Sequence, residues 1–202
     1  MRPAIFLDRD DTLLATTEAT TGTDHPGDLL DPGAVRLLPG AGEACAAIAG
    51  QGLPIVLISN QGLVARGRGT LRDVEAVNDR TRVLLKAHGV RLSGIYYCPF
   101  HPEGVKAEFT GSHSWRKPSP GMFFAAASEL DLDLANSWAV GDASRDGLAA
   151  VTAGLASARV IIVGRGPGLW YADLAAAAAV MIPQLRQQLG LAGVDPSPGA
   201  SR

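Results

Sequence analysis

Cysteine is scarce in this chain, which has only Cys45 and Cys98 among its 202 residues. Two thiols are too few for the disulfide framework that stabilises small secreted proteins. The amino-terminal residues also lack the succession of basic, apolar and small residues that marks a secretory signal. These two absences predict a protein of the reducing cytoplasm.

An excess of charge of one sign is absent, and so are long apolar runs. The 18 basic and 20 acidic residues give a formal net charge of -2, and the longest apolar run, at 174–182, ends at Pro183. Nucleic acids and anionic membranes are bound by wide basic faces, and a helix that spans a bilayer needs roughly 20 apolar residues. We therefore expect no nucleic-acid partner and no membrane anchor. The alanine-rich run is expected to be a helix or a strand packed against the fold.

Apolar residues are abundant, at 47% of the chain, and they recur in short segments. Five of these segments are continuously apolar, as in strands buried on both faces of a parallel sheet, and lie at residues 4–7, 55–58, 95–97, 138–140 and 160–163. Helical spacing between them predicts helices at about 40–50, 70–88, 120–131 and 144–155. This alternation predicts an α/β fold, a doubly wound parallel sheet with right-handed crossovers.

We assign residues 1–190 to one domain and residues 191–202 to a flexible tail, because the tail has almost nothing to bury. Two long irregular stretches remain inside the domain, at 12–39 and 98–119. Loops of this length in a small domain are usually functional. Both are therefore expected to shape a binding site.

Polar side chains follow three of the predicted strands at the point where each ends. They belong to residues 8–12, 59–62 and 141–146, and a fourth polar segment at 116–121 contains Lys117. Ligand sites in doubly wound sheets lie beyond the carboxyl ends of the strands, so these segments are expected to meet at one crevice. Carboxylates clustered there would repel one another unless a hard divalent cation such as Mg²⁺ joined them. Hydroxyl, amide and ammonium donors around them would bind a phosphoryl group, so the constellation favours phosphoryl transfer.

The segment Asp8-Arg9-Asp10-Asp11-Thr12 resembles the D-x-D-x-T signature of the haloacid dehalogenase-like (HAD) phosphatases. Ser59-Asn60, Lys117 and Gly141-Asp142 match the other three motifs of that superfamily in the same order. The resemblance covers most of the chain, from about residue 3 to residue 165. It implies a HAD-like fold and a phosphatase activity.

Two segments narrow the resemblance within the superfamily. Residues 59–67 and 116–122 are similar to the group that contains the D-glycero-D-manno-heptose 1,7-bisphosphate 7-phosphatases and the histidinol-phosphate phosphatases. The intervals between the motifs are filled by core elements. We therefore expect no separate cap domain and a site that is open to solvent.

The resemblance implies a role for each acidic residue of the site. Asp8 would be the nucleophile that forms an aspartyl-phosphate, and Asp10 would be the general acid and then the base. That role requires neighbouring carboxylates to raise the pKa of Asp10, or other contacts to offset them. Mg²⁺ would be held by Asp8, the backbone carbonyl of Asp10, and Asp142. Asp146 would be an outer partner of the ion or a residue that only stabilises a helix start.

Five further residues are assigned to the substrate. Ser59 and Lys117 would hold the phosphoryl oxygens, together with Asn60. Arg116, whose planar fork suits a second phosphate or a carboxylate, would recognise the distal part of the substrate. Arg66 would join it there or would only stabilise its own loop.

Two positions beside the motifs depart from the pattern of the group. Asp11 stands where a glycine is usual, and this third negative group is expected to slow turnover or alter metal binding. Asp tolerates unusual backbone angles better than most residues, so the turn itself is expected to survive. Ala143 replaces a lysine that follows the fourth motif in the heptose enzymes, which weakens the heptose assignment.

The related heptose phosphatases also carry a zinc-stapled loop, with ligands spaced as Cys-x-His and Cys-x-Cys. The corresponding positions here are Cys98, Phe100, His113 and Trp115, of which two cannot bind zinc. His101 is a third candidate ligand, without a clear fourth. We therefore expect no structural zinc and a loop held by Trp115, Phe100 and the prolines.

The sequence thus predicts a Mg²⁺-dependent phosphomonoesterase, expected to be a monomer, that acts through an aspartyl-phosphate on a small phosphorylated metabolite. A sugar bisphosphate such as D-glycero-D-manno-heptose 1,7-bisphosphate is the first candidate. Histidinol phosphate or another small metabolite is an alternative substrate. A phosphate-ester binding module with weakened catalysis is an alternative function, and a subunit whose role is interaction is a third.

Overall fold

The apolar segments of the sequence form one five-stranded sheet in the computed structural model, which describes residues 1–164 and 171–191. All strands run parallel, in the order β3-β2-β1-β4-β5. Their bounds are Ile5–Asp8 for β1, Ile55–Asn60 for β2, Gly94–Cys98 for β3, Trp138–Gly141 for β4 and Val160–Ile162 for β5. The five predicted strands are confirmed, as is the doubly wound α/β fold.

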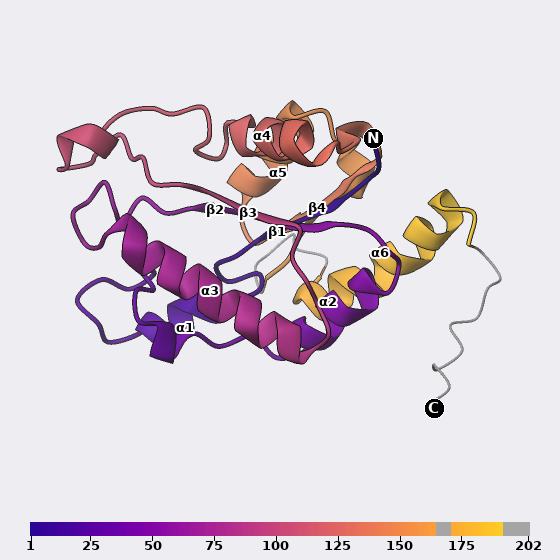
Figure 1. Ribbon diagram of the computed structural model, residues 1–202, viewed down its shortest axis with the longest axis horizontal. Helices are drawn as coiled ribbons and strands as arrows, with labels where there is room; N and C mark the ends of the chain where they lie inside the picture. Colours follow the sequence, from indigo (N-terminus) through magenta and orange to yellow (C-terminus); the bar gives the residue numbers. More distant parts are fainter. Residues whose placement is uncertain (165–170, 192–202) are drawn as a thin grey trace.

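Helices cover both faces of this sheet (Figure 1). The helices of the described ranges are α1 (Thr16–Thr20), α2 (Ala41–Ala49), α3 (Leu71–Ala87), α4 (Gly121–Leu130), α5 (Ser144–Thr152) and α6 (Leu174–Gln188). Helices α4 and α5 lie on one face, and α2, α3 and α6 lie on the other. The four predicted helices correspond to α2, α3, α4 and α5. The alanine-rich run is the first part of α6, which continues through Pro183.

Successive strand residues point to opposite faces of the sheet, and this alternation divides the core into two layers. In β1, Ile5 and Leu7 pack on the side of α2, α3 and α6. Phe6 packs on the side of α4, where its ring centroid lies 4.8 Å from that of Phe123. All four side chains are buried. Because β1 is held from both sides, its carboxyl end, with Asp8, is a rigid base for the site.

The 12–39 stretch is not wholly irregular, which differs from the prediction. It contains α1, a short helix of mostly polar residues, and a 3₁₀ turn at Pro32–Ala34. The carboxylate of Asp11 accepts hydrogen bonds from the backbone N–H and the hydroxyl of Thr17, at 2.8 and 2.5 Å, and so satisfies part of the open first turn of α1. A helix of five residues that is held from outside has no apolar periodicity by which it could be predicted.

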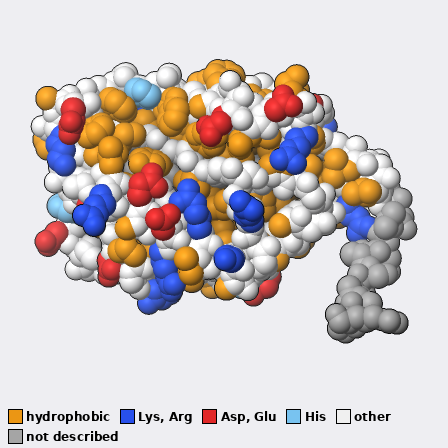
Figure 2. Space-filling model, viewed as in Figure 1, with side chains coloured by type: hydrophobic (Ala, Val, Ile, Leu, Met, Phe, Trp, Pro, Cys, Tyr) orange, Lys and Arg blue, Asp and Glu red, His pale blue; other side chains and the backbone are white. Residues whose placement is uncertain are grey.

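The surface of the molecule mixes charges of both signs. On the face shown in Figure 2, Lys and Arg side chains are interspersed with Asp and Glu, and no broad basic area forms on that face. No helix in the described ranges is both long and apolar enough to cross a bilayer. The tail predicted at 191–202 lies outside the described residues from residue 192 onward.

Candidate active site

Three carboxylates meet beyond the carboxyl ends of β1 and β4. Asp8 ends β1, Asp142 follows β4, and Asp146 lies in the first turn of α5. One oxygen of each lies within 4.8 Å of the others. Leu7 and Val140 are partners in the register of β1 and β4, so the residues that follow them emerge side by side.

Asp146 makes two contacts. One suits a residue that stabilises a helix start, and the other suits a member of the charged site, which are the two roles that the sequence left open. Its Oδ2 accepts a hydrogen bond from the backbone N–H of Ala143 at 3.0 Å, which stabilises the start of α5. Its Oδ1 lies 2.7 Å from Nζ of Lys117. A Cβ on Gly141 would lie 2.4 Å from that of Asp146, so only a glycine lets α5 begin this close to the strand. Asp146 therefore belongs to the carboxylate group and also starts the helix.

Lys117 joins two of the three carboxylates. Its Nζ lies 2.5 Å from Oδ1 of Asp8 and 2.7 Å from Oδ1 of Asp146, and it donates to the carbonyl of Ile58 at 3.0 Å. The lysine is 2% exposed. Its ammonium is therefore held in place by three oxygens inside the protein, as a phosphate-binding or charge-balancing group requires.

Asn60 holds the backbone of Lys117 from both sides. Its Oδ1 accepts a hydrogen bond from the N–H of Lys117 at 2.9 Å, and its Nδ2 donates to the carbonyl of Lys117 at 2.9 Å. The side chain that the sequence assigned to the substrate thus fastens the Lys117 loop to the end of β2. This geometry favours a positioning role for Asn60.

The carboxylate group carries more negative than positive charge. Burial raises the pKa of Asp8 to about 7; the ammonium of Lys117 opposes this shift, and the carboxylates of Asp146 and Asp10 reinforce it. Burial and Asp146 likewise raise the pKa of Asp142. For Lys117, burial favours the neutral form, but Asp8 and Asp146 outweigh it and raise its pKa. The lysine therefore stays protonated, while the carboxylates are short of a counter-charge.

A divalent cation fits this arrangement. Asp8, Asp142 and Asp146 face the ammonium of Lys117, and the half-exposed guanidinium of Arg145 lies 3.8 Å from Asp142, so three carboxylates meet two cations and negative charge stays in excess. Oδ1 of Asp142 is buried and has no hydrogen-bond partner among the described residues. Carboxylate oxygens are the ligands that Mg²⁺ prefers. The predicted ligands Asp8 and Asp142 are thus brought together, with Asp146 beside them, whereas a share for the backbone carbonyl of Asp10 stays a prediction.

Asp10 lies beside this group in a ring of hydrogen-bond donors. Arg9 donates to Oδ1 from Nε and from its terminal nitrogen at 3.3 and 3.2 Å, and Thr16 donates to the same oxygen at 2.7 Å. Ser59 and Gln61 donate to Oδ2 at 2.9 and 2.8 Å. Burial would raise the pKa of Asp10, but Arg9 and the hydrogen bonds from Thr16 and Ser59 outweigh it and lower the pKa. Of the two conditions that the resemblance set for Asp10, the free site therefore shows the second, in which other contacts offset the neighbouring carboxylates.

Three of these donors, Thr16, Arg9 and Gln61, were given no role by the sequence analysis. Arg9 is 1% exposed and also donates to Oδ1 of Asn78 on α3 at 2.8 Å. Gln61 is 3% exposed and also donates to Oγ of Ser59 at 2.6 Å. Arg9 and Gln61 both lie within recognised motifs. The sign of their role in the sequence was a long polar side chain next to a continuously apolar segment that becomes a buried strand.

The pocket at this edge is lined by residues of the four polar segments and of the stretch at 12–39. It has a volume of about 190 Å³ and is lined by Asp8, Asp10, Asp11, Thr16, Gly27, Ser59, Asn60, Lys117, Asp142 and Arg145. The sequence analysis gave no individual role to Thr16, Gly27 and Arg145. Arg66 and Arg116, which were assigned to the substrate, are not part of this lining. Arg116 donates to the carbonyl of Phe100 at 3.1 Å, and Arg66 pairs with Asp28.

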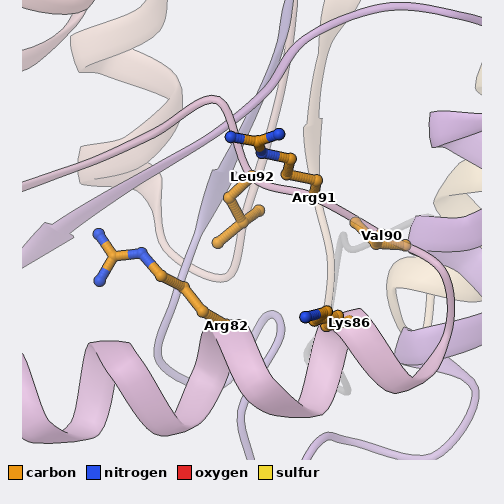
Figure 3. Close-up of a pocket in the computed structure, with 5 residues that line it drawn as sticks. All are labelled: Arg82, Lys86, Val90, Arg91 and Leu92. Carbon is orange, nitrogen blue, oxygen red and sulfur yellow. The ribbon is translucent and has the colours of Figure 1, made fainter.

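A larger hollow of about 440 Å³ lies beside the segment that precedes β3, at the amino end of that strand (Figure 3). Arg82 and Lys86 from α3 lie on one side of it, and Val90, Arg91 and Leu92 from the segment before β3 lie on the other. Its lining, among the residues that the structure describes, contains no carboxylate and none of the motif residues. The small pocket at the carboxyl edge, not this larger one, therefore holds the groups that suit phosphoryl chemistry.

Asp11 adopts the backbone conformation of the glycine that it replaces. Its φ is +55°, in the left-handed region, as expected of a residue that tolerates this region. Its carboxylate lines the pocket and is held by Thr17. The turn therefore survives, and Asp11 adds one carboxylate to the lining of the pocket.

We expect Asp11→Asn to raise kcat/KM for a phosphate ester about two- to fivefold at low ionic strength, because it removes repulsion from the entering anion. Asn keeps the backbone conformation and can keep both contacts with Thr17. The gain should shrink in high salt, which screens exposed charges. Steady-state kinetics over a salt series measure this effect. Asp131→Asn is the matched control, since Asp131 has a φ of +53° at the end of α4; an equal gain in this control would contradict the explanation.

An aromatic cluster stands where the zinc ligands of the related enzymes would be. The rings of Phe100 and His113 stack with centroids 4.2 Å apart and an interplanar angle of 7°, and Trp115 meets His113 edge-on at 6.3 Å. Nδ1 of His113 accepts a hydrogen bond from the N–H of Trp115, and Nδ1 of His101 accepts one from that of Glu103. Burial raises the pKa of the Cys98 thiol. The loop is therefore held by ring contacts and backbone hydrogen bonds.

We expect His113→Ala to lower the free energy of unfolding by about 1 kcal/mol, the typical value of an aromatic pair. A zinc chelator should leave the stability of the unaltered protein unchanged. Urea unfolding with and without the chelator, together with metal analysis of the purified protein, measures both. Stoichiometric zinc, or a loss of stability on chelation, would show that a metal holds this loop.

Comparison with known proteins shows that the similarity of this chain to HAD phosphatases extends beyond the four motifs. The HAD-hydrolase-like family model matches residues 114–168. The D-glycero-beta-D-manno-heptose-1,7-bisphosphate 7-phosphatase of Yersinia pestis is 36% identical over 163 residues, which are 81% of this chain and 82% of that protein.

Solved structures agree with this likeness. A HAD-like phosphatase from Mesorhizobium loti superposes with a TM-score of 0.75 at 33% identity and covers 91% of this chain and 87% of its own. The D,D-heptose 1,7-bisphosphate phosphatase of B. bronchiseptica, solved with magnesium and phosphate, superposes with a TM-score of 0.72 at 29% identity and covers 91% and 99%. With relatives this similar over four fifths of its length, the chain belongs to the HAD-like phosphatases, the family that includes the heptose bisphosphate 7-phosphatases.

Proposed function

We propose that this phosphatase removes the 7-phosphate of D-glycero-D-manno-heptose 1,7-bisphosphate in a Mg²⁺-dependent reaction. The observation that carries the proposal is the group of Asp8, Asp142, Asp146 and Lys117, which brings the proposed nucleophile together with the proposed cation ligands. The named activity of the Yersinia pestis relative supports the substrate, and the magnesium of the B. bronchiseptica structure supports the cation.

Two displacements at phosphorus account for the reaction. An oxygen of Asp8 attacks the phosphorus, the bond to the ester oxygen breaks, and the leaving alkoxide takes a proton from Asp10, which leaves an aspartyl-phosphate. Water then attacks the same phosphorus and gives a proton back to Asp10, and Asp8 is released as a carboxylate with inorganic phosphate. Mg²⁺, held by Asp8 and Asp142 with Asp146 beside them, would supply neutralisation of the phosphoryl charge.

Ser59 and Lys117 exchange partners when the substrate binds. In the free site Ser59 donates to Asp10 and Lys117 donates to Asp8. A bound phosphoryl group draws both donors to its own oxygens. Asp10 then loses a donor and gains a dianion as neighbour, and both changes raise its pKa from the lowered value of the free site. Asp10 is thereby able to hold the proton that the leaving alkoxide needs.

Basic side chains around the mouth of the site would recognise the second phosphate. Arg145 lines the pocket and is half exposed. Arg116 and Arg66 lie farther out, in the loops at 98–119 and after β2, and the planar fork of each suits a phosphate. The pocket itself is small, so the rest of the sugar lies against these loops.

Turnover of a panel of phosphate esters tests the proposed substrate. The heptose bisphosphate, histidinol phosphate and several sugar monophosphates are compared by kcat/KM, and the position of the phosphate that is lost is read by NMR. We expect the bisphosphate to give the highest value, with loss of activity in EDTA and recovery with Mg²⁺. A preference for histidinol phosphate would support the alternative substrate, and binding without hydrolysis would support the binding module.

We also propose that the enzyme acts as a monomer in the cytoplasm. The bacterial relatives that act on a small sugar phosphate support this setting. Light scattering on the purified protein measures its mass in solution, and a dimer would contradict the proposed state.

A further inference from the structure

Asp28 is a buried carboxylate that the catalytic steps do not use. Its side chain is 6% exposed. Its Oδ1 accepts a hydrogen bond from Arg66 at 3.0 Å, and its Oδ2 accepts one from Arg68 at 2.8 Å. Asp28 lies between α1 and the 3₁₀ turn, whereas both arginines lie in the loop that follows β2. One carboxylate therefore joins two loops that are 38 to 40 positions apart in the chain.

The segment that carries Asp28 forms a wall of the active-site pocket. Gly27, its neighbour, lines that pocket. The N–H of Gly27 donates to Oγ1 of Thr20 at 2.8 Å, which holds the segment from the side of α1. The ion pairs of Asp28 with Arg66 and Arg68 hold it from the side of β2.

The arginines need this carboxylate because their surroundings are basic. Gly67, with a φ of +69°, makes the tight turn between Arg66 and Arg68. The N–H of Arg66 donates to the carbonyl of Gly62 at 3.1 Å, and a Cβ on Gly62 would lie 3.1 Å from Nη1 of Arg116, so both arginines lie against this glycine. Burial, together with the charge of Arg66, lowers the pKa of Arg116. Burial and the charges of Arg116 and Arg66 also lower the pKa of His101. Without Asp28, Arg66 would be repelled from its neighbours and would turn toward solvent.

We propose that Asp28 is a positioning residue that fixes Arg66 beside Arg116 for the distal phosphate of the substrate and holds the adjoining loop as the wall of the phosphoryl pocket. The inference rests on the proposed function, because the distal phosphate of a bisphosphate is the group that these arginines would meet. A guanidinium held in place in advance loses less freedom when the phosphate binds. Asp28 thus acts on KM for substrates with a second phosphate, and it has no part in the steps at phosphorus.

The test compares Asp28→Asn, Arg66→Ala and the double variant on two substrates. One substrate is the heptose bisphosphate, and the other is p-nitrophenyl phosphate, which has no second anionic group. Asp79→Asn is the matched control, since Asp79 pairs with Arg82 on the exposed side of α3. Asp28→Asn should raise KM for the bisphosphate about tenfold with kcat unchanged, and the bisphosphate should lose more than the aryl ester. The double variant should be no worse than Arg66→Ala, since the two residues act as one unit.

Each contrary result has a distinct meaning. If the unaltered enzyme does not favour the bisphosphate, the proposed function fails, and this inference fails with it. If it does favour the bisphosphate but Asp28→Asn keeps the same KM, loses both substrates equally or adds fully to Arg66→Ala, the inference alone is overturned. Should Asp28→Asn not fold, Asp28→Glu keeps the charge and displaces Arg66; it should raise KM for the bisphosphate selectively, and an unchanged KM would overturn the inference.

Discussion

Asp8→Asn is expected to lower kcat on the order of 10⁴-fold or more, because it replaces the proposed nucleophile by an amide that does not attack phosphorus. Asn has nearly the same shape, and the side chain sits at the end of a strand that is packed on both faces. The variant should therefore fold. Its circular dichroism spectrum and cooperative unfolding should match those of the unaltered protein.

The kinetics of Asp8→Asn are measured with the substrate that the unaltered enzyme prefers, at saturating Mg²⁺. Asp79→Asn on the surface of α3 is the control for the loss of one carboxylate, and it should keep full activity. A residual kcat within tenfold of the unaltered enzyme would show that Asp8 is not the nucleophile. Loss of activity with loss of the folded spectrum would show that Asp8 is needed for the fold.

Lys117→Met is expected to lower the free energy of unfolding by about 3–5 kcal/mol in the absence of divalent cations, the usual cost of removing one partner of a buried ion pair. The change leaves Asp8 and Asp146 without the only ammonium in contact with them in the described part of the chain. Added Mg²⁺ should recover part of this loss, since a bound cation stabilises the folded state. The stabilisation by Mg²⁺ should therefore be larger for Lys117→Met than for the unaltered protein.

Urea unfolding at one pH, with and without MgCl₂, measures both effects of Lys117→Met. Lys86→Met is the control, because Lys86 is exposed near the end of α3 and its replacement should change stability by less than about 0.5 kcal/mol. Equal losses in the two variants, or equal stabilisation by Mg²⁺ in Lys117→Met and the unaltered protein, would contradict the charge balance of the site.

The position of the site could be predicted because a parallel sheet gathers the ends of its strands at one edge. Asp8, Ser59 and Asp142 each follow a continuously apolar segment, and their convergence requires only that those segments be neighbouring strands. Lys117 was found by its motif, although its loop follows no strand directly. Its contacts with Asp8 and Asp146 show that the order of the four motifs along the chain correctly indicated that Lys117 meets the carboxylates.

The contacts that set the chemistry of Asp10 could not be predicted in the same way. Its pKa depends on Arg9, Thr16 and Ser59, whose donors meet it only once the loops are folded. Sequence spacing indicated that carboxylates were near and gave no sign of which donors would surround this one. The sequence therefore left open whether the neighbouring carboxylates or other contacts would set this pKa.

The loop partners of Arg66 and Asp11 were also beyond what local sequence patterns could predict. Arg66 was identified, but its partner Asp28 lies 38 positions away in a segment without periodicity. Asp11 was correctly expected to tolerate the conformation of a glycine, whereas the bonds that tie it to Thr17, and with them α1, were not foreseen. In each case the missing information was a pairing between loops.

The stereochemical course at phosphorus tests the central claim, that turnover passes through a phosphorylated aspartate. A phosphate ester made chiral at phosphorus with oxygen isotopes is hydrolysed by the Mg²⁺-loaded enzyme, and the configuration of the released phosphate is determined. Two successive displacements, the first by Asp8 and the second by water, predict retention of configuration. Inversion would mean that water attacks the substrate directly, and the account of Asp8 as nucleophile would then be wrong.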